Sequence, residues 1–190
     1  DMFRLPGIFR SVYLTVKPEI QLRDLQVIPQ LDLKRGQGVL ELTAEVERSG
    51  KKRSVDEQVR YHLYSLPLYS DEPVERLPVE TQSRVDAEGI ARTSLTLDAP
   101  KLWSAEAPYR YVLVAELYDR TGKRLLDRAS IYTGFRQVEI RETSAHEDEF
   151  GRAGRYFYVN GRPVKLKGTN RHETNPERGH AITREQMQQE

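Results

Sequence analysis

Apolar and polar residues alternate along residues 20–133 in short runs separated by turn residues. This period of two is typical of antiparallel strands that bury one face of a sheet. The clearest run places Leu40, Leu42, Ala44 and Val46 on one face, with Glu41, Thr43, Glu45 and Glu47 on the other. Seven such runs in about 115 residues predict an all-β fold, a seven-stranded immunoglobulin-like antiparallel sandwich.

Proline and glycine mark the ends of some of these runs. The first spans about Ile20 to Ile28 and is expected to end at Pro29. The last two are joined by residues 119–122, where Gly122 can supply the positive φ of a tight hairpin. The others centre on residues 40–47, 59–64, 77–82 and 91–97, and the joined pair covers 110–118 and 123–133. The chain has no cysteine, so the two sheets must be held by burial alone, and no disulfide scaffold or thiolate metal site is possible.

Charge and length exclude several classes of function. Lys and Arg total 30 against 29 for Asp and Glu, and a net charge of +1 gives no field to attract nucleic acid or an anionic membrane. No apolar run is long enough to span a bilayer. With 190 residues the chain is also too short for a complete (β/α)₈ barrel, which needs about 250.

The pattern changes after Gly134. Asn160-Gly161 is a strong two-residue turn signal between apolar-alternating flanks, and it predicts a hairpin. A strand from Val164 to Gly168 is expected next, followed by a polar cluster at residues 170–173 and a helix that begins with a capping box of Thr183 and Gln186. Strand, polar loop and helix form the start of a βα unit, which indicates a chain cut inside a larger protein.

Four stretches of this sequence resemble glycoside hydrolase family 2, and within it the β-galactosidases. They are DMFRLPGIFRSVYL at residues 1–14, LWSAEAPYRYVLVAEL at 102–117, GFRQVEI at 134–140 and FYVNGRPVKLKGTNRHETNP at 157–176. The last is the most specific, because arginine at position 171 distinguishes the galactosidase branch from the glucuronidases, which commonly have lysine there.

The resemblance implies three segments: the end of an N-terminal sugar-binding jelly roll at residues 1–18, an immunoglobulin-like domain at 19–134, and the truncated start of a catalytic TIM barrel at 135–190. It also implies a parent enzyme that hydrolyses terminal β-galactosides with retention and uses Mg and Na. The acid/base and the nucleophile of that enzyme are both glutamates expected downstream of residue 190. No catalytic residue is therefore expected in this chain, and the chain alone is predicted to be inactive.

The same resemblance assigns roles to residues of the polar cluster. His172 and Asp1 are expected to contact the galactosyl group, and Asp1 to supply part of a sodium site in the parent. Asn170, Arg171 and Glu173 are expected to support them. Arg171 would hold a barrel carboxylate or bridge two loops, and Glu173 would be a hydrogen-bond acceptor or a solvated charge. In a barrel, residues at the C-terminal ends of strands face the substrate, which fits this placement.

Two other kinds of protein are alternatives to a β-galactosidase. A free-standing carbohydrate-binding sandwich would leave residues 157–190 without a partner, and a family 2 β-glucuronidase or β-mannosidase would share the same architecture. Trp103, the only tryptophan, could stack on a sugar but is expected to pack in the core. The spacing of His172 and His180 does not match a zinc peptidase helix. Apolar residues of the hairpin predict that the isolated chain docks on itself or forms a weak homodimer.

Overall fold

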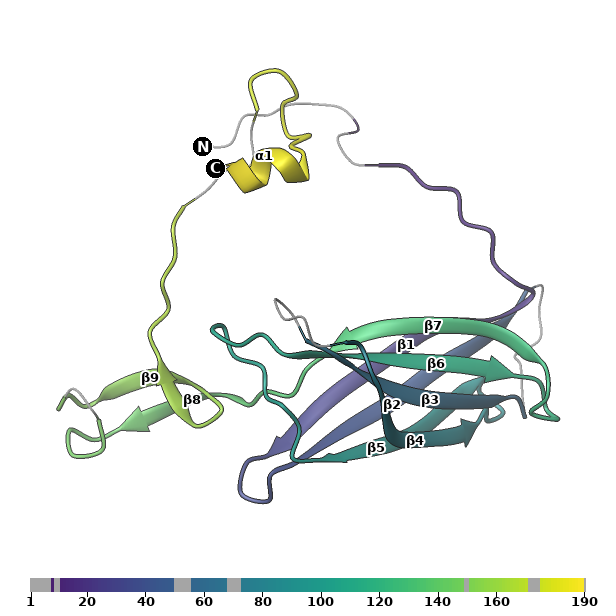
Figure 1. Cartoon of the computed structure of the whole chain (residues 1–190), viewed down its shortest axis with the longest axis horizontal. Coiled ribbons are helices and arrows are strands. Elements are labelled where there is room, and N and C mark those ends of the chain that lie inside the picture. Colours follow the sequence, from purple (N-terminus) through teal and green to yellow (C-terminus); the bar gives the residue numbers. More distant parts are fainter. Residues whose placement is uncertain are drawn as a thin grey trace. The chain divides into compact units, whose positions relative to one another are not determined.

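The computed structural model describes residues 8, 11–49, 56–67, 73–148, 151–170 and 175–189. The described residues form ten strands and one short helix (Figure 1). The strands are β1 (Ile20–Asp32), β2 (Gln37–Arg48), β3 (Gln58–Leu66), β4 (Arg76–Arg84), β5 (Ile90–Asp98), β6 (Arg110–Tyr118), β7 (Leu125–Thr133), β8 (Val138–Thr143), β9 (Gly154–Val159) and β10 (Arg162–Val164), and the helix is α1 (Arg184–Gln189). The chain divides into two units, Lys17–Val164 and a second made of residues 1–16 and 165–190.

The seven predicted strands form two antiparallel sheets. One sheet has the order β1-β2-β5 and the other the order β4-β3-β6-β7. The fourth strand therefore pairs with β3 instead of extending the sheet that contains β5. This arrangement confirms the immunoglobulin-like sandwich expected from the sequence.

The core lies between the two sheets and is built by the alternation that the sequence shows. In β2, Leu40, Leu42, Ala44 and Val46 are buried, while the residues between them face outward. The central strands β3 and β6 of the other sheet contribute their own buried rows. These rows are Val59, Tyr61 and Leu63, and Tyr111, Leu113, Ala115 and Leu117.

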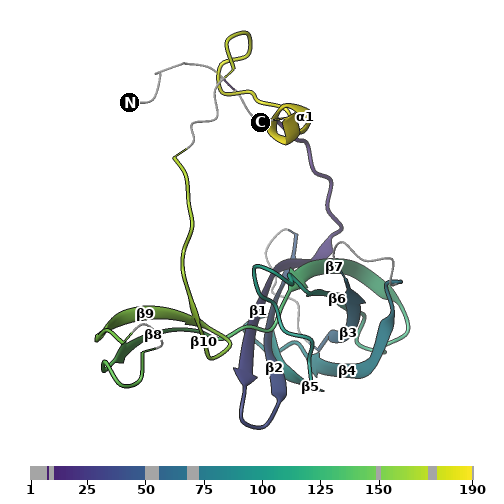
Figure 2. The same ribbon diagram turned by 60° about the vertical axis from the view of Figure 1, so that its left-hand side comes forward.

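The sheets also approach each other along both pairs of edges, so that in Figure 2 the strands enclose the core on all sides. At one edge the backbone N–H of Leu22 in β1 donates to Asp127 Oδ2 in β7 over 2.8 Å. At the other edge the hydroxyls of Thr81 in β4 and Thr93 in β5 are 3.0 Å apart. These hydrogen bonds substitute for a covalent bridge between the sheets, which the chain cannot form.

The prediction that the first strand ends at Pro29 is wrong. β1 continues to Asp32, and Pro29 pairs with Leu40 of β2. The reason is that β1 is an edge strand with one neighbour. A proline, which lacks a backbone donor, is tolerated at an edge because that donor is not needed by a second neighbour.

Phe135 closes the end of the core, although it follows the last sandwich strand. Its ring is fully buried and packs edge-to-face on Tyr111, with centroids 5.4 Å apart. Gly38 of β2 makes room for it, because a Cβ at that position would lie 2.5 Å from the ring. The Phe135 carbonyl accepts a hydrogen bond from the Trp103 N–H over 2.9 Å. The connection out of the sandwich is therefore anchored inside it.

Strands β8, β9 and β10 form a separate three-stranded sheet in the order β10-β9-β8. The predicted turn is present, with positive φ at both Asn160 (51°) and Gly161 (77°). The Asn160 side chain accepts from the Gln137 N–H over 3.0 Å and donates to the Trp103 carbonyl over 2.9 Å. The Asn-Gly pair therefore both turns the chain and ties this sheet to the loop that carries Trp103.

The prediction of a strand from Val164 to Gly168 is wrong beyond its first residue. β10 ends at Val164, and residues 165–170 form no strand in the described structure. A parallel barrel strand is held by neighbours on both sides, whereas β10 is an edge strand that pairs only with β9. The sequence alternation alone is not sufficient to fix strand geometry there.

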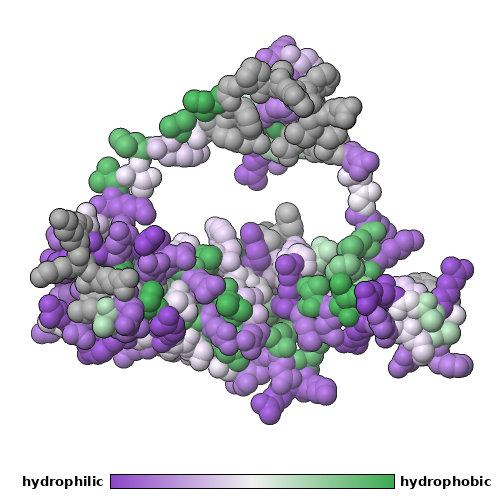
Figure 3. Space-filling model, turned by 180° about the vertical axis from the view of Figure 1, so that it is seen from behind, coloured by the Kyte–Doolittle hydropathy of each residue, from purple (hydrophilic) through white to green (hydrophobic). Residues whose placement is uncertain are grey.

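In the second unit, the predicted capping box starts α1. The Thr183 N–H donates to Gln186 Oε1 over 3.0 Å, and the Gln186 N–H donates to Thr183 Oγ1 over 3.3 Å. The segment before β1 exposes apolar side chains, including Leu14 at 95% and Val16 at 92%. Figure 3 shows hydrophobic residues in green along this segment. Among the described residues, no helix has the length and apolar character needed to cross a bilayer.

Candidate functional site

Four of the five residues predicted to serve the substrate site lie outside the described residues. These are Asp1, Arg171, His172 and Glu173. Asn170 is described, and its side chain is exposed at the end of the stretch that follows β10. The roles of all five therefore stay predictions from the family resemblance.

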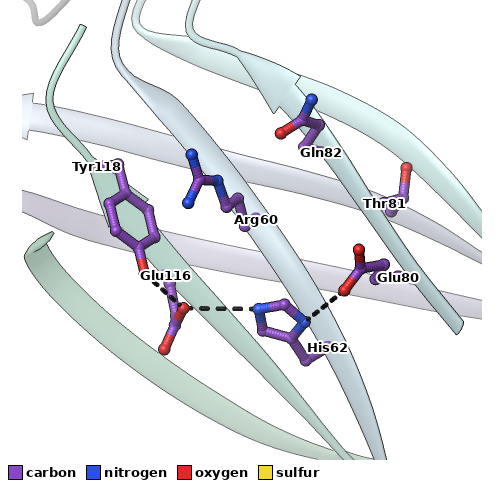
Figure 4. A pocket seen from close by; sticks show the side chains of 7 residues that line it. All are labelled: Arg60, His62, Glu80, Thr81, Gln82, Glu116 and Tyr118. Atoms are coloured by element: carbon purple, nitrogen blue, oxygen red, sulfur yellow. Dashed lines mark hydrogen bonds and ion pairs between the residues drawn. The ribbon is translucent and has the colours of Figure 1, made fainter. Parts of the chain in front are cut away.

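A polar depression of about 480 Å³ lies on the outer face of the β4-β3-β6 part of the sandwich. Figure 4 shows how seven side chains from these strands surround it. They are Arg60 and His62 from β3, Glu80, Thr81 and Gln82 from β4, and Glu116 and Tyr118 from β6. Cross-strand pairing brings them together, because Arg60 is opposite both Gln82 and Glu116.

His62 is the centre of this cluster, and only 14% of its side chain is exposed. Its Nδ1 lies 2.6 Å from Arg76 Nη2 and 3.5 Å from Glu80 Oε2, while its Nε2 lies 3.5 Å from Glu116 Oε2. A guanidinium can only donate hydrogen bonds. Nδ1 is therefore the acceptor of the Arg76 hydrogen bond, which leaves Nε2 toward Glu116.

Glu116 is held in its charged form. Its partial burial favours the neutral acid, but hydrogen bonds from Tyr118 and Arg128 outweigh burial and lower the pKa of the carboxyl below its usual value. The Tyr118 hydroxyl donates over 3.0 Å and Arg128 Nη2 over 2.6 Å. Arg60 lies 4.2 Å from the centre of the Tyr118 ring and also donates to the Gly122 carbonyl. Most polar groups here are satisfied within the protein.

The contacts of His62 with Glu80 and Glu116 tie β3, β4 and β6 together across the sheet. A retaining glycosidase needs one protonated and one ionised carboxyl group, and the surroundings of Glu116 do not suit the protonated one. In the described ranges, no group of three or more His, Cys, Asp or Glu side chains could hold a metal ion.

Sequence reasoning did not identify this cluster as a site. Along β3 buried residues alternate with partly exposed ones, which puts Arg60 and His62 on the same outer face. Their partners on β4 and β6 depend on strand register, which is shifted by an irregularity between His62 and Tyr64. Alternating hydrophobicity fixes which face a residue is on but does not fix which residue it meets across the strand.

Fold and site together define a β-sandwich module followed by a small separate sheet and a short helix. Two family models match consecutive parts of the chain. The model for "Glycosyl hydrolases family 2" matches residues 20–136, and the model for "Glycosyl hydrolases family 2, TIM barrel domain" matches residues 152–190. The chain belongs to glycosyl hydrolase family 2, which confirms the resemblance noted in the sequence.

Curated relatives are named β-galactosidase. The protein from Halalkalibacterium halodurans is 33% identical over 187 residues, which cover 98% of this chain and 16% of the relative. The protein from Yersinia pestis (strain Angola) is 35% identical over 198 residues, covering 100% of this chain and 17% of the relative. The chain thus spans about a sixth of the length of these relatives.

Similar solved structures are β-glucuronidases. The apo structure of Bacteroides uniformis β-glucuronidase 3 matches with a TM-score of 0.72 and 26% identity, and the match covers 100% of this chain and 20% of that protein's chain. A Bifidobacterium dentium β-glucuronidase matches with a TM-score of 0.66 and 20% identity, and the match covers 87% of this chain and 24% of that protein's chain. The latter likeness supports the fold alone.

Proposed function

We propose that the chain is part of a retaining β-galactosidase that hydrolyses terminal β-galactosides. The observation that supports this most directly is the alignment with curated β-galactosidases over 98–100% of the chain at 33–35% identity. Arg171, the residue that distinguishes the galactosidase branch in the sequence, agrees with this proposal. The substrate of the whole enzyme would be a β-galactoside.

Within that enzyme the sandwich would be a structural domain. Its outer-face cluster holds Glu116 ionised and hydrogen-bonded, so Glu116 is not suited to act as a general acid. The acid/base and nucleophile would come from glutamates outside this chain. The chain alone would therefore hydrolyse no glycoside.

His172 and Asp1 would contact the sugar in the complete enzyme, with Asn170, Arg171 and Glu173 in supporting positions. A histidine can donate to a sugar hydroxyl with one ring nitrogen while a neighbour orients the other. Asp1 would supply one oxygen ligand to a sodium ion. The remaining sodium ligands and all magnesium ligands would lie elsewhere in the enzyme.

The test compares the 190-residue chain with the full-length protein that contains it. Both are assayed on aryl β-galactoside, β-glucuronide and β-mannoside, and the anomer released is followed. The proposal expects the full-length protein to cleave the galactoside with retention and the chain to cleave none of the three. Turnover by the chain alone, or inversion by the full-length protein, would refute it.

The second candidate is a family 2 β-glucuronidase. The observation in its favour is the whole-chain likeness to the Bacteroides uniformis β-glucuronidase 3 structure. The same assay separates the two, because a glucuronidase would cleave the glucuronide and leave the galactoside. In either case His172→Ala in the full-length enzyme is expected to lower kcat/KM by about 10²-fold or more, as removal of a transition-state hydrogen bond does.

A further inference from the structure

A groove of about 610 Å³ lies on the surface of the sandwich, apart from the cluster around His62, with which it shares no lining residue. It is lined by Val27 and Pro29 of β1, by Tyr132 and Thr133 of β7, and by residues of the flanking loops and β8. Both β1 and β7 are edge strands. At Leu22 and Asp127 these edges are joined by a hydrogen bond, and the groove is a surface depression to which both edges contribute side chains.

Two arginines line the groove, Arg110 and Arg136, and they differ from other arginines of the chain in having no carboxylate partner among the described residues. Arg128 and Arg141 form ion pairs with Glu116 and Glu139. Among the described residues Arg110 and Arg136 pair with no carboxylate, and each lies over an aromatic ring instead. A charged donor without an acid nearby is available to an anion from outside.

Arg110 carries the stronger evidence. Its Nε is buried and has no hydrogen-bond partner in the described structure. An unsatisfied buried donor is costly, and more so when it is charged. Its guanidinium, a rigid fork of hydrogen-bond donors, lies 4.9 Å from the centre of the Tyr132 ring, which also lines the groove. Such a fork is suited to bidentate contact with a carboxylate.

Arg136 also lines the groove and lies 4.6 Å from the centre of the Trp103 ring. The other lining residues are mainly apolar or aromatic, among them Val27, Pro29 and Val138. A small hydrated anion would leave this apolar surface unused. An extended peptide would use it, because alternate side chains of a strand can reach the arginines and the apolar walls in turn.

We propose that this groove is a docking site for an extended acidic segment of polypeptide, whose carboxylate is held by Arg110 and Arg136 while its apolar side chains contact Val27 and Val138. The absence of a carboxylate partner for either arginine within the described residues argues for this charge. The apolar walls and the two strand edges argue for an extended polypeptide.

The test uses the 190-residue chain and a fluorescein-labelled peptide of alternating glutamate and valine. Binding is followed by anisotropy and by the fluorescence of Trp103, the only tryptophan, which lines the groove. The matched peptide carries glutamine in place of glutamate, and free glutamate is titrated separately. Arg110→Gln and Arg136→Gln are compared with Arg128→Gln, which removes an arginine outside the groove. Urea unfolding of each variant checks that it is folded.

We expect the acidic peptide to bind, with an affinity that falls as salt rises. Arg110→Gln and Arg136→Gln should each weaken it by about tenfold, and Arg128→Gln should leave it unchanged. Equal binding of the glutamine peptide, unchanged binding to folded Arg110→Gln and Arg136→Gln, or no binding at millimolar peptide would overturn the proposal. Competition by free glutamate at peptide-like concentration would also overturn it, because the site would then be for small anions.

Discussion

Replacing Gly38 with alanine tests whether Phe135 truly closes the core. The added methyl would lie 2.5, 2.6 and 3.0 Å from three ring carbons of Phe135, where carbon contacts normally lie at about 3.5 to 4.0 Å. The ring cannot move aside easily, because it is fully buried and packs on Tyr111. Overpacking of this kind costs about 1 to 3 kcal/mol, and a gap of about 1 Å to be opened against a buried ring favours the upper half of that range.

The assay is urea unfolding of the 190-residue chain followed by Trp103 fluorescence. Trp103 reports on this region because its N–H donates to the Phe135 carbonyl. The free energy of unfolding should fall with an unchanged urea dependence, which shows that stability and not compactness has changed. Gly168→Ala is the matched control, since a Cβ there would meet nothing within 4 Å, and it should change stability by less than about 0.5 kcal/mol.

A double variant sharpens the test. Phe135→Leu alone should destabilise by creating a void, but it shortens the side chain that a methyl at position 38 would hit. Gly38→Ala and Phe135→Leu together should therefore cost less than the sum of the single changes by about 1 kcal/mol or more, within the range seen for residues in contact. Additive effects, or a Gly38→Ala variant as stable as the parent, would refute the packing argument.

Four other predictions concern separate parts of the chain. Glu116 has a lowered pKa in the folded state, so its contribution to stability is present above the unfolded-state pKa and is lost as pH falls through the folded value; the free energies of unfolding of the parent and Glu116→Gln should converge on acidification. Burial raises the pKa of Tyr61 and Tyr111 to about 12, against about 10 when unfolded, so stability should fall as pH rises from 10 toward 12, and absorbance should show these phenols ionising only with unfolding. Thr183→Ala should destabilise α1 by about 1 kcal/mol, while Thr183→Ser should keep the helix as stable as in the parent. Amide chemical shifts of α1 measure this, and equal shifts in both variants would contradict it. The exposed apolar face of β8 and β9 should form a weak homodimer that Ile140→Lys abolishes; sedimentation of the parent as a monomer at all concentrations would refute it.

The sequence predicts those parts of the fold that depend on local chemistry. The capping box of Thr183 and Gln186, the Asn160-Gly161 turn and the buried row of β2 are all confirmed, because each follows from residues within a few positions of one another. Pro29 was misjudged because its effect depends on whether β1 has one neighbour or two, which is a property of the sheet.

The tertiary features were less predictable. Phe135 and Gly38 are far apart in sequence, and nothing in either neighbourhood indicates that one leaves room for the other. The cluster around His62 depends on strand register and on a local irregularity in the β3–β4 pairing. The substrate residues are predicted from family resemblance alone, since a polar cluster such as residues 170–173 has no periodic signal of its own.

The Asn160-Gly161 turn has a consequence for the chemical durability of the protein. An asparagine followed by glycine is prone to deamidation, because the small next residue lets its backbone nitrogen attack the side-chain amide. Asn160 would have to release Gln137 and Trp103 before this could happen, so folding should protect it. Once converted to aspartate, it would lose its donor and place a negative charge against the Trp103 carbonyl. We expect mass spectrometry to find faster deamidation at this site in the unfolded than in the folded protein, so that chemical ageing loosens the hairpin from the sandwich; equal rates would contradict this.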